Sequence, residues 1–213
     1  MIVNDLRLCL VTNILDQPFP CYKTFLLQAI EGGVTSVQLR SKMLNHVDFH
    51  ALALSLKLFL SPLNIPLIIN DHVDIAVTVD ADGVHIGQSD CAPTDVREQL
   101  GRDKWIGLSV ETLSDLERAN ALDCIDYIAA SALFPTQTKT VCKTYWGLAG
   151  LQILVDHSRH PVVAIGGINK KNIKDVMHCG AAGVAVVNAI HDVPNPAQAA
   201  RDLIHAMSGA CHV

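Results

Sequence analysis

Polar and charged residues stand close together early in the chain, in the run Gln38-Leu39-Arg40-Ser41-Lys42. This run follows a short apolar segment, and if that segment continues as a strand, Gln38, Arg40 and Lys42 point to the same side. Two cations and an amide on one face suit a polyanion, such as a phosphorylated molecule. A solvated strand end with ordinary salt bridges is the alternative interpretation, since exposed charges are common.

Two carboxylates, Asp71 and Asp90, follow two later apolar runs that are neighbours in the chain, and Asn70 directly precedes the first of them. Beside the cations, these carboxylates suit a hard divalent ion, which needs few protein ligands when substrate phosphates supply the others. A paired general acid and base is a second interpretation, but it leaves the cations unexplained. A third is that Asp71 caps a helix beginning at Val73.

Ser109 and His85 also stand at the ends of apolar runs. Ser109 lacks a Gly-x-Ser-x-Gly setting, so we do not interpret it as a nucleophile. It is either a hydroxyl that contacts a ligand or a hydroxyl that caps the next helix. His85 is the one histidine of ten beside the polar residues, and we interpret it as a packed, hydrogen-bonded strand residue, because a lone histidine is weak support for catalysis.

Three segments in the second half of the chain could bind a second anion. A long stretch over 131–146 includes Thr136, Thr138 and Lys139, which can bind an anion or close over a site as a lid, and a loop of this length is more often functional than idle. Gly166-Gly167 and Val187-Asn188 follow the last two apolar runs. There, glycine allows backbone N–H groups to approach a phosphate, although a tight turn explains the glycine pair equally well.

The elements that must position these residues are eight short apolar runs, at 8–12, 34–39, 66–69, 83–86, 105–109, 127–130, 162–165 and 183–187. Segments with helical spacing separate most of them, at 19–31, 47–60, 93–100, 113–121, 148–157, 170–179 and 197–207. Continuous runs are typical of parallel strands covered on both faces. The pattern predicts an α/β fold, a (β/α)8 TIM barrel forming a single domain over 1–213, whose site lies at the carboxyl ends of the strands. A doubly wound open sheet competes, but the first run lacks the glycine-rich turn of a dinucleotide site.

Composition narrows the class of protein further. The chain has 213 residues, of which 50% are hydrophobic and 17% charged, with a net charge of −5, and this argues against disorder and against a nucleic-acid surface. Seven scattered cysteines without a close pair indicate reduced thiols rather than a secreted disulfide framework. No signal peptide or membrane-length apolar segment is evident. We therefore expect a cytoplasmic protein that binds small phosphorylated molecules, with neither nucleic acid nor a membrane as partner; a homo-oligomer is left open.

Five blocks of this sequence, in order, resemble the signature blocks of the thiamine-phosphate synthase family. They read QLRSK (38–42), IND (69–71), ADGVHIGQSD (81–90), PTQTK (135–139) and AIGGI (164–168). One block alone is weak, but five in the family's order, within a resemblance that runs from about Leu8 to Ile190, form a specific signal. The resemblance implies a barrel enzyme that joins a hydroxymethylpyrimidine diphosphate to a thiazole phosphate. The products would be thiamine phosphate and pyrophosphate, and Mg²⁺ would be required.

Carried over residue by residue, the resemblance implies a role for each matching side chain. The pyrimidine diphosphate would be bound by Gln38, Leu39, Arg40, Ser41, Lys42, Asn70, Ser109 and Lys139. The thiazole phosphate would be bound by Thr136, Thr138, Gly167, Val187 and Asn188. Mg²⁺ would be held by Asp71 and Asp90, and the catalytic cations that stabilise the departing pyrophosphate would be Arg40, Lys42 and Lys139.

Two positions depart from the family pattern. Ser131-Ala132 stand where the family usually has Gly-Pro, and Asn188 stands where it usually has serine. Two other functions also compete: a thiazole tautomerase-like relative, and a non-catalytic binder of thiazole phosphate or thiamine phosphate. The cations and carboxylates of the diphosphate side argue against the first, and the second would not need the pair of carboxylates.

Overall fold

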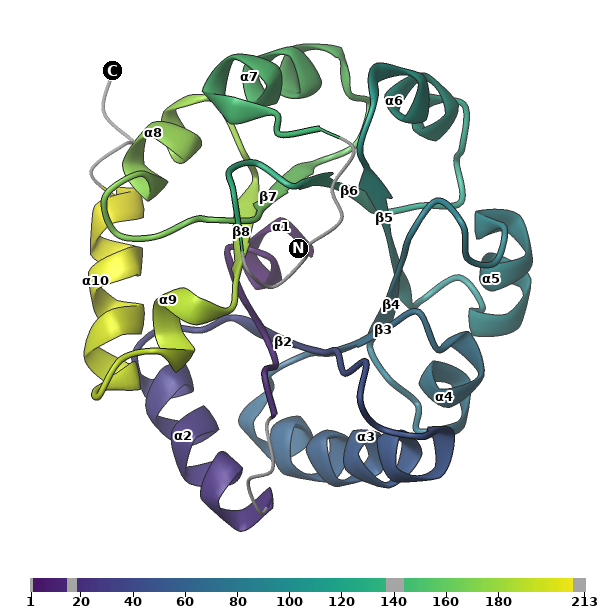
Figure 1. The fold of residues 1–213 in the computed structure, drawn as a ribbon. Coiled ribbons are helices and arrows are strands. Elements are labelled where there is room, and N and C mark those ends of the chain that lie inside the picture. Colours follow the sequence, from purple (N-terminus) through teal and green to yellow (C-terminus); the bar gives the residue numbers. More distant parts are fainter. Residues whose placement is uncertain (1, 15–18, 137–143, 209–213) are drawn as a thin grey trace.

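The computed structural model describes residues 2–14, 19–136 and 144–208. Its strands are β1 (Leu8–Val11), β2 (Ser36–Leu39), β3 (Leu67–Asn70), β4 (Gly83–Ile86), β5 (Trp105–Val110), β6 (Tyr127–Ser131), β7 (Val162–Ile165) and β8 (Gly183–Val186). Each strand pairs in parallel with the next, and β8 pairs with β1, so the sheet closes into a barrel (Figure 1). The predicted (β/α)8 fold is therefore confirmed.

Helices form a ring around this barrel (Figure 1). They are α2 (Phe19–Glu31), α3 (His46–Leu60), α4 (Val73–Thr78), α5 (Pro93–Leu100), α6 (Leu113–Asn120), α7 (Gly147–His157), α8 (Ile173–His178) and α10 (Pro196–Ser208). Three shorter elements are α1 (Ile2–Asp5), which precedes β1, the 3₁₀ turn η1 (Ser61–Leu63) and α9 (Asn188–His191), which follows β8. In the described residues no helix is long and apolar enough to cross a membrane.

Two helices differ from the sequence-based expectation. Helix α4 was not among the segments with helical spacing, because its six residues are too few to show a helical period, although a helix beginning at Val73 was one alternative for Asp71. Helix α8 begins later than predicted, at Ile173 instead of residue 170. The reason is that Asn169 and Asn172 bind nearby backbone groups: Asn172 accepts from the Asn169 N–H at 2.9 Å and donates to the Gly167 carbonyl at 3.0 Å. Such local side-chain bonds favour a turn over a helix.

The apolar core has two parts that follow the alternation along each strand. Leu67 and Ile69 of β3 belong to the large cluster between the strands and the helices, whereas Ile68 belongs to a smaller cluster inside the barrel. The inner cluster is made of Leu6, Cys9, Val11, Ile68, Tyr127, Val163 and Ala185. Because both faces of each strand are covered, the strands appear as continuous apolar runs in the sequence.

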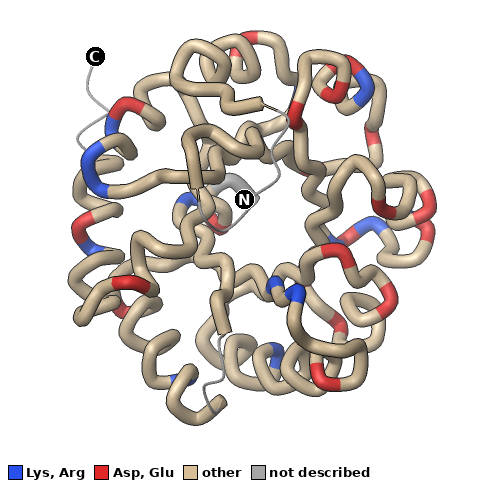
Figure 2. Tube along the Cα trace, viewed as in Figure 1, with Lys and Arg blue, Asp and Glu red and all other residues tan. Residues whose placement is uncertain are grey.

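Polar residues enter the barrel interior toward the carboxyl ends of the strands. Gln38, His85 and Ser131 come from three different strands, and all three are buried. Most charged residues instead lie on the outer helices and on the loops (Figure 2). The barrel therefore closes over an apolar interior and opens to a polar region at one end, which is where parallel barrels hold their ligands.

Candidate active site

A cavity of about 970 Å³ lies at the carboxyl ends of the strands, and each strand or the loop after it contributes to the lining. This volume is typical of a small-molecule site. The predicted site residues that line it are Gln38, Arg40, Lys42, Asn70, Asp71, Asp90, Ser109, Thr136, Gly167, Val187 and Asn188. Two others, Thr138 and Lys139, lie outside the described residues.

Leu39 and Ser41, which were also predicted to bind the diphosphate, have side chains placed away from the cavity lining. Leu39 is fully buried in the cluster between the strands and the helices. The Ser41 hydroxyl accepts hydrogen bonds from the N–H groups of Met43 and Leu44, both at 3.3 Å. The physical reason is the alternation of an extended chain, which turns every second side chain to the opposite face.

The cationic side of the cavity begins where β2 ends, and Thr12 holds it in place. The Arg40 N–H donates to the Thr12 hydroxyl at 3.0 Å, and that hydroxyl donates to the Arg40 carbonyl at 3.2 Å. The Thr12 N–H also donates to the Gln38 carbonyl at 2.8 Å. These bonds extend the contact between the β1 and β2 chains past the end of β2. Gln38, Arg40 and Lys42 consequently all line the cavity, as their spacing predicted.

Asp71 and Asp90 meet at the mouth of the cavity from the loops after β3 and β4. Asp71 has a positive φ of 64°, and its N–H donates to the His85 carbonyl at 2.9 Å. Asp90 accepts a hydrogen bond from the Gly87 N–H at 2.7 Å. The alternative that Asp71 caps α4 is wrong, because the cap position of that helix is His72.

Burial and the neighbouring Asp90 both act on the carboxyl group of Asp71. Desolvation raises the pKa of Asp71 to about 6, the charge of Asp90 and a hydrogen bond with it act in the same direction, and Arg40 and Lys42 act in the opposite direction. A raised pKa beside a second carboxylate means that the ionised pair is unfavourable unless a cation balances its charge. An oxygen-only pair of this kind fits a hard divalent cation such as Mg²⁺.

Ser109 is held by a buried network inside the barrel rather than by a helix. Its hydroxyl lies 2.9 Å from His85 Nε2, and His85 Nδ1 lies 3.1 Å from the Tyr127 hydroxyl. The prediction that His85 is a packed, hydrogen-bonded strand residue is confirmed, since it is only 7% exposed. Helix α6 is capped instead by Thr112, which forms a capping box with Asp115.

Gly107 makes room for this network, and neither it nor Tyr127 was expected to matter from the sequence. A Cβ atom on Gly107 would lie 2.1 Å from Tyr127 Cζ and 2.5 Å from His85 Nδ1. Burial raises the pKa of Tyr127 well above its ordinary value, so the hydroxyl stays protonated. The residues come from β4, β5 and β6, which pair in sequence order, but only the register shows that they are neighbours.

Across the mouth, Gly166 and Gly167 form a turn after β7 that requires glycine. Their φ angles are 102° and 65°. A Cβ atom on Gly167 would lie 2.7 Å from the Pro135 carbonyl oxygen, and the Phe134 N–H donates to the Gly166 carbonyl at 3.1 Å. The loop after β6 therefore lies directly against this turn. The glycine pair forms a turn and also lines the cavity, and the binding of a phosphate by its N–H groups stays a prediction.

The two positions that depart from the family pattern both line the cavity. Ser131 and Ala132 are joined by a cis peptide bond at the end of β6. Asn188 begins α9, and its side-chain amide donates to the carboxylate of Asp192, which also lines the cavity. The sequence did not predict that Asp192 lines the cavity, because Asp192 lies several residues beyond the end of β8, where an anion-binding residue was expected.

The closed order of the strands places the loop after β3, which bears Asp71, across the barrel mouth from the glycine turn after β7, whereas β2 and β8 are separated by β1 alone. In an eight-stranded ring, β3 and β7 are four strands apart in either direction. The cations and carboxylates follow β2, β3 and β4, whereas the glycine turn and Asn188 follow β7 and β8. The cavity can therefore hold two anionic molecules side by side, with the carboxylate pair on one side.

Comparisons with known proteins find relatives that are similar in sequence and in fold. A family model described as thiamine monophosphate synthase matches residues 8–190. The thiamine-phosphate synthase of Vibrio parahaemolyticus is 45% identical over 205 residues, covering 96% of this chain and 100% of that protein. That of Chlamydia caviae is 43% identical and covers 92% of each chain. The crystallised thiamine phosphate pyrophosphorylase from Pyrococcus furiosus superposes with a TM-score of 0.87 at 30% identity, over 100% of both chains.

Proposed function

This chain belongs to the thiamine monophosphate synthase family, and from that premise we propose that it is a transferase that makes thiamine phosphate. Its substrates would be a hydroxymethylpyrimidine diphosphate and a thiazole phosphate. In the reaction the thiazole ring nitrogen forms a bond to the pyrimidine methylene carbon, the bond from that carbon to the diphosphate oxygen breaks, and its electron pair leaves with pyrophosphate. A cytoplasmic location, without nucleic acid or a membrane as partner, belongs to the same proposal and rests on composition.

The diphosphate would lie on the side of the cavity formed by the loops after β2, β3 and β4. Arg40 and Lys42 supply positive charge there, Asn70 supplies an amide, and Lys139 is expected from the sequence to add a third cation. Negative charge grows on the diphosphate as its bond to carbon breaks. Cations already in position stabilise this growing charge in the transition state more than in the bound substrate, and this lowers the barrier.

Asp71 and Asp90 would hold Mg²⁺ beside the diphosphate. When bound, this ion supplies positive charge to the phosphate oxygens of the leaving group. The raised pKa of Asp71, about 6, supports the assignment. Burial and the neighbouring Asp90 make two ionised carboxylates unfavourable here when no cation is bound.

The remaining residues would orient the two rings. Ser109 would bind the pyrimidine, and His85 holds its hydroxyl at 2.9 Å. The thiazole phosphate would lie against the turn at Gly167, with Thr136, Thr138, Val187 and Asn188 around it. No protein nucleophile is required, since the substrate nitrogen attacks directly, and catalysis would consist of positioning and charge stabilisation.

One observation supports this proposal above the others: the cationic and carboxylate residues lie across the barrel mouth from the glycine turn, in one cavity. A transferase that joins two phosphorylated substrates needs two anion sites of this kind. A protein that binds only one phosphorylated molecule needs one.

The test is to incubate the purified chain with Mg²⁺ and both substrates, and to measure pyrophosphate and thiamine phosphate. We expect equal amounts of the two products, and none when either substrate is omitted. Turnover of a thiazole substrate alone would instead indicate a tautomerase-like relative. Tight binding of thiazole phosphate without any turnover would indicate a non-catalytic binder.

Two isosteric variants distinguish the loss of a proposed Mg²⁺ ligand from the loss of a negative charge elsewhere on the protein. Asp90→Asn should reduce the rate steeply, because a neutral amide cannot replace a carboxylate at a cation. Asp103→Asn makes the same change at an exposed residue that precedes β5, at the opposite end of the barrel, and should leave the rate unchanged. Equal rates in both variants would contradict the assignment of Asp90.

A further inference from the structure

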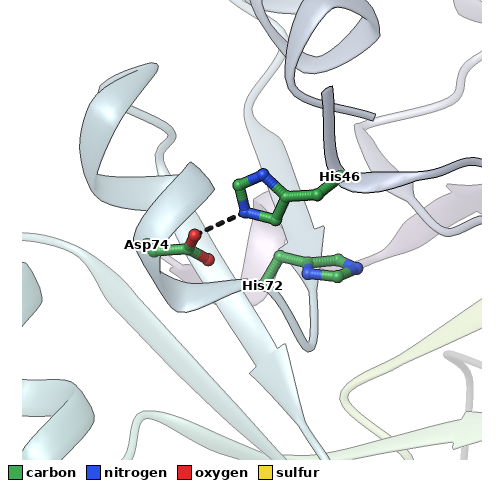
Figure 3. Close-up of side chains that lie close together, drawn as sticks. All are labelled: His46, His72 and Asp74. Atoms are coloured by element: carbon green, nitrogen blue, oxygen red, sulfur yellow. Dashed lines mark hydrogen bonds and ion pairs between the residues drawn. The ribbon is translucent and has the colours of Figure 1, made fainter. Parts of the chain in front are cut away.

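A second group of metal-binding side chains lies where α3 and α4 begin, apart from the described residues that line the cavity. It consists of His46, the first residue of α3, His72, which directly precedes α4, and Asp74, the second residue of α4. One donor atom from each residue lies within 4.8 Å of the other two. Figure 3 shows His46 and Asp74 pointing toward each other, with the His72 ring beside them.

Local structure fixes where these side chains stand. Asn45 caps α3 by accepting the Asp48 N–H at 3.0 Å, and this sets His46 at the first position of the helix. The His72 ring packs on Phe49, with ring centroids 4.5 Å apart. It meets the His46 ring edge-on at 5.9 Å. The two imidazoles therefore stand together because two helices begin side by side.

Asp74 and His46 already form a direct contact, with His46 Nε2 lying 2.6 Å from Asp74 Oδ2. Burial tends to raise the pKa of Asp74, but the hydrogen bond from His46 and other contacts outweigh it, so that the pKa is lowered. The group thus offers an ionised carboxylate. The amino ends of two helices carry partial positive charge, which opposes a cation, and this carboxylate offsets it.

We propose that His46, His72 and Asp74 bind one divalent ion of the Zn²⁺, Co²⁺ or Ni²⁺ class, with water completing its coordination. Two imidazoles and one carboxylate form a ligand set that such ions prefer, whereas the oxygen-only pair Asp71 and Asp90 suits Mg²⁺. The site is open to solvent, since the side chains of His46 and Asp74 are 58% and 61% exposed. An ion can therefore enter without a change in the fold.

The geometry needs only a small adjustment to hold an ion. With metal–nitrogen distances of about 2.0 Å, the ligand atoms of a tetrahedral site lie about 3.3 Å apart. The present separations are at most 4.8 Å. Rotation of the two exposed side chains, His46 and Asp74, can close this difference while His72 stays packed on Phe49.

An ion at this site would connect two loops that also border the cavity. His46 follows the loop that bears Lys42, and His72 directly follows Asp71. Binding would therefore tie the start of α3 to the start of α4 and raise the melting temperature. This inference stands on the two helix ends and does not depend on the proposed transferase function.

The experiment is a titration of the metal-free full-length protein with Co²⁺ in excess Mg²⁺, followed by visible absorption and by calorimetry. We expect binding at one site in the wild-type protein, with the spectrum of nitrogen and oxygen ligands and a rise in melting temperature. His46→Gln and His72→Gln each remove one ligand. Each should weaken binding at this site by at least about tenfold, because even loss of an outer hydrogen bond to a metal ligand commonly costs that much.

Control variants exclude other sites for the ion. His178→Gln removes an exposed histidine on α8, across the barrel from α3, and should bind Co²⁺ as the wild type does. Equal binding in the wild type, His46→Gln and His72→Gln would overturn the proposal. So would an intense sulfur-to-cobalt band that disappears in Cys91→Ser or Cys21→Ser, or loss of the site in Asp90→Asn with the two histidine variants unaffected.

Discussion

Asp71 illustrates how much the chemistry of one residue depends on its surroundings. Its side chain is of an ordinary type, yet its pKa is raised to about 6 by desolvation and by Asp90, against the attraction of Arg40 and Lys42. Its backbone adopts a left-handed conformation, held by the hydrogen bond to the His85 carbonyl. The residue is thus kept at the cavity mouth although its carboxylate is poorly stabilised there without a cation.

We predict that Mg²⁺ binding depends on pH because of this shift. An ordinary aspartate is ionised above pH 4, but a group with a pKa of about 6 still holds its proton at pH 5. Protons then compete with the metal ion, so the apparent affinity should be constant above pH 7 and fall by up to about tenfold per pH unit below pH 6. Calorimetric titration with Mg²⁺ from pH 5 to pH 8 measures this.

The matched control is Asp71→Asn, which has no group to titrate at this position. It should bind Mg²⁺ more weakly at every pH and should lose the step near pH 6. If the wild-type affinity is the same at pH 5 and pH 7, the carboxyl group does not hold the ion or its pKa is not raised.

At the level of elements, three neighbouring strands share the task of holding Ser109. Strand β4 provides His85, β5 provides Gly107 and Ser109, and β6 provides Tyr127. The absence of a side chain at Gly107 is what lets Tyr127 and His85 meet inside the barrel, within hydrogen-bond distance at 3.1 Å. Strand register is therefore as important to this part of the site as the residue types.

We predict that Gly107→Ala destabilises the protein by about 1–3 kcal/mol, the usual cost of an extra carbon in a packed core. The added Cβ would lie 2.1 Å from Tyr127 Cζ, so both Tyr127 and His85 must move. The movement should also raise the KM for the pyrimidine substrate, since His85 would no longer hold Ser109. Urea denaturation and steady-state kinetics measure the two effects.

Tyr127→Phe is the comparison variant, since it removes the hydrogen bond to His85 without adding volume. It should cost about 1 kcal/mol, the net value of one hydrogen bond. A Gly107→Ala protein as stable as the wild type would show that the barrel interior has more space here than the distances indicate.

At the level of the whole molecule, closure of the barrel brings distant parts of the chain to one cavity. Strand β8 pairs with β1, and α10 packs against α2, so the last elements of the chain close the barrel against the first. The loops after β2 and β8 consequently line the same cavity, although most of the chain separates them. The loops after β2 and β8, which bear residues of the two proposed anion sites, are therefore separated by β1 alone, whereas those after β3 and β7 lie four strands apart.

We predict that substitutions on the two sides affect different substrates. Lys42→Ala should raise the KM for the pyrimidine diphosphate by about tenfold or more, because a charged hydrogen bond contributes about 1.5–3 kcal/mol. Asn188→Asp should raise the KM for thiazole phosphate, because it places a second carboxylate beside Asp192. In each variant, the KM for the other substrate should change by less than about twofold, since Lys42 and Asn188 lie on separate loops, after β2 and β8, with β1 between those strands.

Asn188→Ser is the control for the loss of the amide without a new charge. The binding free energy of thiazole phosphate, as its KM reports it, should change by no more than about 1 kcal/mol, which is the net value of one hydrogen bond. If Lys42→Ala and Asn188→Asp change both KM values equally, the two anion sites are not distinct.

The sequence alone determined the fold class and many of the polar residues that line the cavity. Apolar runs that alternate with helical segments predict a parallel barrel, because each run is covered on both faces and each return to the next strand requires a crossover. The position of a residue after a strand then predicts its place at the carboxyl end. For this reason Arg40, Lys42, Asp71, Asp90 and Gly167 could be placed at one end of the barrel before the structure.

Only the tertiary structure decided which side chains touch. Leu39 and Ser41 face away from the cavity, Asp71 does not cap α4, and that short helix left no readable period. The contacts of Ser109 with His85 and of His46 with Asp74 depend on strand register and on where two separate helices begin. A sequence specifies local conformation through neighbouring residues, whereas these contacts arise only when the closed barrel fixes the distance between separate loops.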